Sequence, residues 1–108
     1  MRAASAIALA GVALLAGCGG GGSAPRRHVH LTSFERQGKA LFVHTCGSCH
    51  TLAGAGTSGI AGPALDQPWE ASRVRETIAD GPGLMPAALL TGTAADAVAA
   101  YVAAATGG

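Results

Sequence analysis

The stretch Cys46-Gly47-Ser48-Cys49-His50 decides how the rest of this 108-residue chain is interpreted. Its two cysteines are three positions apart, so on a helical turn their side chains point in the same direction. A histidine follows the second cysteine directly. A C-x-x-C-H sequence of this kind indicates covalent attachment of a c-type haem.

The order of these five residues has a mechanical reason. Cys46 and Cys49 can form thioethers to the two vinyl groups of one porphyrin, while His50 is carried beneath the ring and ligates the iron. We therefore predict one covalent haem c, bound through both cysteines, with His50 as an axial metal ligand.

Three other interpretations of the motif compete with haem attachment. A redox-active C-x-x-C would lie beside a βαβ pattern, which the sequence lacks. A zinc site needs four ligands, and a second pair of thiols is missing. A structural disulfide between Cys46 and Cys49 would leave His50 unexplained. Haem attachment accounts for all three residues.

A second axial ligand follows by elimination. The chain has two methionines, and Met1 is expected to leave with a signal peptide. Met85 remains, in the turn-rich stretch Gly81-Pro82-Gly83-Leu84-Met85-Pro86, which can hold a side chain against the open face of the iron. We predict Met85 as the sixth ligand; the alternative is a loop methionine packed on the core.

Ligands on both faces of the iron define the expected function. Histidine and methionine leave no position for substrate or oxygen, and methionine raises the reduction potential. The chain is therefore expected to carry single electrons and not to be an enzyme, with redox proteins as transient partners. Two alternatives stay open: a gas-binding or sensory haem protein with a labile Met85, and a haem-carrying accessory subunit of a larger oxidoreductase.

The N-terminal part predicts export. Residues 1–17 begin with a basic residue and continue as an uncharged Ala/Leu/Val run, the pattern of a signal peptide. The sequence Leu15-Ala16-Gly17-Cys18 resembles the lipobox of bacterial lipoproteins, which implies lipidation of Cys18. Residues 18–31 are rich in glycine and then basic, as in a flexible tether. We expect anchoring to the extracytoplasmic face of the cell membrane; an ordinary signal peptide is the alternative.

Charge and cysteine content agree with this organisation. Loss of residues 1–17 removes Arg2, so Lys+Arg falls from 7 to 6 against 6 Asp+Glu, a formal balance of zero. No basic footprint for nucleic acid remains. Three cysteines are accounted for by one lipid and two haem attachments.

Residues 32–108 are expected to form a single all-α domain. Thr32-Ser33-Phe34-Glu35 fits a capping box, which predicts a first helix to about His44. A second helix is predicted over about residues 70–80, ended by Gly81-Pro82. A third helix, capped by Thr91 or Thr93, should run to the terminal glycines. No stretch alternates with period two for long enough to predict a sheet.

These residues together resemble the small monohaem, class I cytochromes c of bacteria. The likeness includes Gly38-Lys39-Ala40-Leu41-Phe42, similar to the family's first helix, and Tyr101, at the position where that helix crosses the C-terminal one. It implies a cytochrome c fold of three to four helices around one haem, in a respiratory or related electron-transfer chain at the outer face of the cytoplasmic membrane. A glycine at the crossing lets two helix backbones approach closely.

The same resemblance assigns further roles around the haem. Gly62-Pro63-Ala64-Leu65 is similar to the family's proximal loop, which implies that the Pro63 carbonyl orients His50 and that Leu65 packs on the ring. Trp69 looks like a tryptophan that donates a hydrogen bond to a haem propionate, with Arg73 as a neighbour; a place in the core is the alternative for Trp69.

Overall fold

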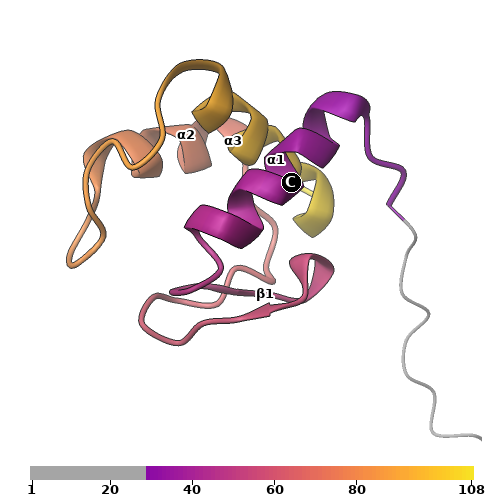
Figure 1. The fold of residues 1–108 in the computed structure, drawn as a ribbon. Helices are drawn as coiled ribbons and strands as arrows, with labels where there is room; N and C mark the ends of the chain where they lie inside the picture. Colours follow the sequence, from indigo (N-terminus) through magenta and orange to yellow (C-terminus); the bar gives the residue numbers. More distant parts are fainter. Residues whose placement is uncertain (1–28) are drawn as a thin grey trace, which may run out of the picture.

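The structure, a computed structural model, describes residues 29–108. The predicted signal peptide, Cys18 and most of the predicted tether lie outside the described residues. Within residues 29–108 the chain forms three α-helices and one short hairpin (Figure 1). The prediction of a small all-α fold is confirmed. No helix among these residues is both long and apolar enough to cross a membrane.

The first helix, α1 (Ser33–Thr45), begins with the predicted capping box. The Glu35 N–H donates to the Thr32 hydroxyl at 3.1 Å, and the Thr32 N–H donates to the Glu35 carboxylate at 2.7 Å. Two backbone donors at the helix start are thereby satisfied. The helix ends one residue later than the sequence predicted.

Glycines end the other two helices. Helix α2 (Ala71–Asp80) is followed by Gly81 with φ 59°, and helix α3 (Gly92–Thr106) is followed by Gly107 with φ 77°. Both values are left-handed, a conformation that glycine adopts without steric cost. Thr91 precedes α3 as predicted, although its side chain makes no capping hydrogen bond.

A two-stranded hairpin follows the motif residues and was not predicted. Strand β1 (Thr51–Leu52) pairs antiparallel with β2 (Thr57–Ser58), with Thr51 opposite Ser58 and a 3₁₀ turn (Ala53–Ala55) between them. Strands of two residues are too short to show a period of two in sequence. The hairpin therefore adds to the all-α fold without changing its class.

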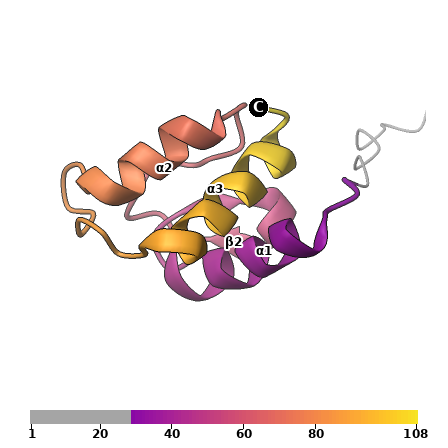
Figure 2. The same cartoon turned by 90° about the horizontal axis from the view of Figure 1, so that it is seen from above.

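Helix α3 lies between α1 and α2 (Figure 2). It crosses α1 at Gly38, where a Cβ atom would overlap the Ala97 carbonyl and lie 2.8 Å from Tyr101 Cβ. The rings of Phe42 and Tyr101 meet edge to face beside this crossing, 5.9 Å apart at an angle of 62°. The buried core is formed by these two rings with Leu52, Ile78, Ala95, Val98 and Val102.

The crossing predicts the effect of Gly38→Ala. The added methyl group has no space, and overpacking of this kind should lower the free energy of unfolding by about 1–3 kcal/mol. Gly54→Ala is the control, because its Cβ would make only ordinary contacts, 3.6 Å from Ala105 Cβ. Denaturant titrations of both variants should separate them; equal stability would contradict the close crossing.

Tyr101 predicts a pH dependence. Its hydroxyl is buried without a hydrogen-bond partner among the described residues, and burial raises the pKa of the phenol. The folded domain therefore favours the neutral phenol over the phenolate. This preference contributes fully to the free energy of unfolding below about pH 10, the ordinary pKa of tyrosine. The contribution is lost as the pH rises towards the higher pKa of Tyr101 in the folded state. Tyr101→Phe should raise the free energy of unfolding by about 1 kcal/mol at neutral pH and remove this alkaline loss. Denaturant titrations at about pH 7 and pH 10.5 test both effects; a variant as alkali-sensitive as the native chain would exclude Tyr101 as the cause.

Candidate functional site

A cavity of about 390 Å³ lies between the helices and the two long connections of the fold. Its walls come from the end of α1, the segment around Pro63, α2, the loop after α2, and α3. All seven haem-binding residues predicted from the sequence line it: Cys46, Cys49, His50, Pro63, Leu65, Trp69 and Met85. The fold thus gathers residues that are spread over forty positions of the chain.

The motif residues extend α1 by one more turn. The Cys46 N–H donates to the Phe42 carbonyl at 2.8 Å, and the His50 N–H donates to the Cys46 carbonyl at 2.9 Å. This turn brings both thiols and the imidazole to the cavity wall. Both thiols are free; Cys46 is buried and Cys49 is exposed. Burial, with a smaller effect of the neighbouring Cys49, raises the pKa of the Cys46 thiol to about 11.

The His50 ring is held by a backbone acceptor and by a glycine. Its Nδ1 lies 2.8 Å from the Pro63 carbonyl oxygen. A Cβ at Gly62 would lie 2.5 Å from Cε1 and 2.8 Å from Nδ1 of the same ring. With Nδ1–H donating to Pro63, the proton is fixed on Nδ1, and Nε2 keeps its lone pair for a metal.

Hydroxyl groups of the hairpin position the segment that carries His50. Thr57 donates to the His50 carbonyl at 2.9 Å and accepts from the Leu52 N–H at 3.0 Å. Thr51 donates to the Gly59 carbonyl at 2.9 Å. The sequence analysis did not identify either threonine, because no motif or period marks them, and it did not predict that Gly62 contacts the imidazole.

Met85 reaches the cavity from the loop between α2 and α3. Its side chain is half-buried, and its backbone N–H donates to the Pro82 carbonyl at 3.1 Å. Met85 and His50 line the same cavity from segments far apart in the sequence. Phe42, Val98 and Val102, which belong to the buried core, also form its wall.

Trp69 lines the cavity, and its backbone is fixed by a hydrogen bond to the end of α3. Its N–H donates to the Thr106 hydroxyl at 3.0 Å, and that hydroxyl donates to the Val102 carbonyl at 2.8 Å. The indole Nε1–H is buried and has no acceptor among residues 29–108. A buried donor without a partner is costly, and this group has a free hydrogen-bonding position.

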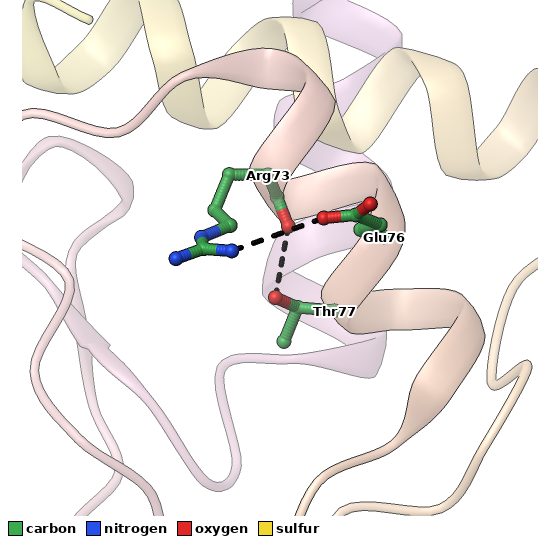
Figure 3. Close-up of polar contacts among 3 residues, drawn as sticks. All are labelled: Arg73, Glu76 and Thr77. Atoms are coloured by element: carbon green, nitrogen blue, oxygen red, sulfur yellow. Dashed lines mark hydrogen bonds and ion pairs between the residues drawn. The ribbon is translucent and has the colours of Figure 1, made fainter.

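Arg73 differs from the expectation that placed it near Trp69 and a propionate. It does not line the cavity. Figure 3 shows its guanidinium directed at Glu76 on the exposed surface of α2, 3.9 Å from the carboxylate, while the Thr77 hydroxyl donates to the Arg73 carbonyl.

The zinc interpretation finds no ligand set in the part of the chain that the structure describes. No group of three or more His, Cys, Asp or Glu side chains comes together there.

A small all-α domain with an apolar interior cavity, two free thiols and a histidine on its wall defines a c-type haem protein. Residues 34–102 match the family model described as "Cytochrome C oxidase, cbb3-type, subunit III", and the chain belongs to this family of cytochrome c domains. The family implies a covalently bound c-type haem and electron transfer.

A solved structure supports the same conclusion. The c-type cytochrome SorU from Sinorhizobium meliloti is 38% identical, with a TM-score of 0.62, and the alignment covers 68% of this chain and 92% of that one. No curated protein sequence matches.

The residues present fit a haem. The cavity wall is almost entirely apolar, and the C-x-x-C-H thiols and imidazole open onto it. The unpartnered indole N–H of Trp69 offers a donor for a carboxylate. An apolar wall with a few placed polar groups is typical of a cofactor site.

Trp69→Phe tests the role of that donor. Loss of a hydrogen bond to a propionate raises the propionate pKa, so the pH-dependent part of the reduction potential should move to higher pH. Tyr101→Phe is the control, because its buried hydroxyl also lacks a partner but does not line the cavity. The reduction potentials of the two variants are measured as a function of pH. If Trp69→Phe has the same pH dependence of the potential as the native protein, Trp69 is a core residue and not a propionate donor.

Proposed function

We propose that this chain is a one-electron carrier with a single haem c, ligated by His50 and Met85, in a respiratory or related electron-transfer chain. One observation carries the proposal: the cavity is lined by both thiols of the motif, by His50 and by Met85. A histidine and a methionine at one c-type haem site are the ligand pair of electron-transfer cytochromes.

Each residue of the site has a role in this proposal. A bound haem supplies the one-electron chemistry of its iron. Cys46 and Cys49 hold the ring covalently, and the Pro63 carbonyl, 2.8 Å from His50 Nδ1, makes the ligating nitrogen more basic. Met85 favours the reduced state and raises the potential. Leu65 packs against the ring, and Trp69 donates to a propionate.

The surface at the mouth of the cavity suits transient partners. None of the cavity-lining residues is an Asp, Glu, Lys or Arg. Leu84, on the rim, is 99% exposed, and Ile60, beside the lining residue Ala61, is 92% exposed. Without charges to steer association, docking rests on apolar contact with redox proteins. Such complexes are expected to form and separate rapidly.

A haem-carrying subunit of a larger oxidoreductase is the second candidate. The matched family model is named for a subunit of an oxidase, whereas SorU is named as a c-type cytochrome, and 92% of that chain is covered by this one domain. Purification from mild detergent extracts separates the candidates. A stable co-purifying oxidoreductase would favour the subunit, and the chain alone would favour the carrier.

Membrane attachment through Cys18 is part of the proposal. The lipobox-like sequence before Cys18 and the glycine-rich stretch after it support a lipid-anchored tether. The domain would then lie at the extracytoplasmic face of the cell membrane. Mass spectrometry of the mature N-terminus tests this: an acylated Cys18 is expected, and an unmodified or different N-terminus would exclude the anchor.

The visible absorption spectrum, oxidised and reduced, tests the ligand pair directly. Protein made with a c-type haem maturation system should show the sharp reduced bands of a low-spin haem c and a weak far-red sulfur-to-iron band when oxidised. A high-spin spectrum would favour the gas-binding or sensory alternative. Absence of covalent haem would refute the whole proposal.

Met85→Ala should open one axial position. The reduction potential is expected to fall by on the order of 100 mV, within the roughly 0.8 V range that axial ligands set. Carbon monoxide should also bind to the reduced variant but not to the native protein. Ile60→Ala, at an exposed position that does not line the cavity, should change neither property. A Met85→Ala protein with the native potential and no ligand binding would exclude Met85 as the ligand.

A further inference from the structure

The loop that carries Met85 leaves the end of α2 and returns to the same place. We call residues 81–88 the Met85 loop. It begins at Gly81, whose N–H donates to the Thr77 carbonyl at 2.9 Å. It ends at Ala88, whose N–H is shared between the carbonyls of Ile78 at 2.9 Å and Ala79 at 3.2 Å. Both ends of the loop are therefore bonded to the last turn of α2.

The returning backbone passes directly over Gly81. A Cβ atom at this position would overlap the Ala87 nitrogen and lie 2.5 Å from Ala87 Cα and 2.6 Å from the Met85 carbonyl oxygen. These neighbours are backbone atoms of the loop, which cannot turn aside as the end of a flexible side chain can. Only a residue without a Cβ permits the loop to close in this form.

The other end of the loop holds an unusual conformation. Ala88 has φ 50°, and no other non-glycine residue among residues 29–108 has a positive φ. A left-handed alanine is unfavourable by itself. It persists because the surrounding structure holds it, and here the shared hydrogen bond from Ala88 N–H to α2 does so. The closed loop is thus maintained against local strain.

From this geometry we infer that Gly81 is a positioning residue for Met85: its missing side chain lets residues 85–87 close onto the end of α2 and so holds the thioether at the cavity. The inference rests on the proposed His50/Met85 ligation. It goes beyond that proposal because it assigns the strength of the methionine ligand to a residue that does not touch the iron. Opening of the loop would release Met85 without unfolding the helices.

Binding of imidazole to the oxidised protein measures this effect. An added ligand must displace Met85, so its apparent affinity rises with the fraction of molecules in which the loop is open. Gly81→Ala should raise the apparent imidazole affinity by about tenfold. A tenfold change corresponds to about 1.4 kcal/mol, which is within the usual destabilisation caused by an extra methyl group in a tightly packed site. The far-red band should weaken in parallel.

Two further variants separate close approach from backbone conformation. Asparagine tolerates a left-handed backbone better than alanine does but still carries a Cβ. Gly81→Asn should therefore also raise the affinity, and a native affinity in this variant would overturn the close-approach argument. Gly107→Ala is the matched control at the end of α3, with φ 77° and nothing within 4 Å of the added Cβ; it should leave imidazole binding unchanged. Equal effects of Gly81→Ala and Gly107→Ala would also overturn the inference.

Hydrogen exchange in the native holoprotein tests the same coupling without any substitution. Saturating imidazole should speed exchange of the Ala88 amide, which closes the loop, but not of the Phe42 amide in α1. Unchanged protection of Ala88 would show that the loop does not open when Met85 leaves, and would refute the inference even if the variants fail to fold. A native protein that lacks the far-red band would instead contradict the proposed ligand pair.

Discussion

The close crossing of α1 and α3 at Gly38 is the contact on which the other elements depend. Because the two backbones nearly touch there, the end of α1 places Cys46, Cys49 and His50 on one side of α3. The same helix α3 supplies Val98 and Val102 to the cavity wall and, through Thr106, holds the backbone of Trp69. Helix α2 packs on the opposite side of α3 and carries the Met85 loop. One crossing therefore sets the relative position of both predicted ligands.

The sequence predicts the three helices and the residues of the candidate haem site, but not the contacts that position those residues. The capping box at Thr32 and the glycines after α2 and α3 are local signals, and the structure has the helices they predicted. The motif and Met85, the methionine among residues 29–108, are brought to one cavity by the fold. The hairpin strands have only two residues each, and the contacts of Thr57 and Gly62 with His50 depend on the exact path of the segment after the motif, which no periodicity in the sequence marks. Arg73, which the resemblance placed beside a propionate, pairs with Glu76 at the surface and does not line the cavity.

The two predicted ligand sites are built differently. His50 lies on an extension of α1 and is held by the Pro63 carbonyl, the ring contact with Gly62 and the hairpin hydroxyls. Met85 lies in a loop whose two ends are hydrogen-bonded to the last turn of α2, and its side chain packs against the core. In the proposed carrier, the histidine side is the one held by more contacts from the rest of the fold. The Met85 side depends on the close backbone approach at Gly81 and on the left-handed Ala88.

The composition of α3 also affects the entropy of folding. Four of its buried residues are alanines, namely Ala95, Ala97, Ala99 and Ala103. An alanine loses no side-chain rotamer freedom on burial, whereas a longer side chain loses up to about 2 kcal/mol. Alanine also has the highest intrinsic helix propensity. A domain of this size has little buried surface with which to offset the loss of conformational entropy on folding. The many alanines of its central helix keep the side-chain part of that loss small.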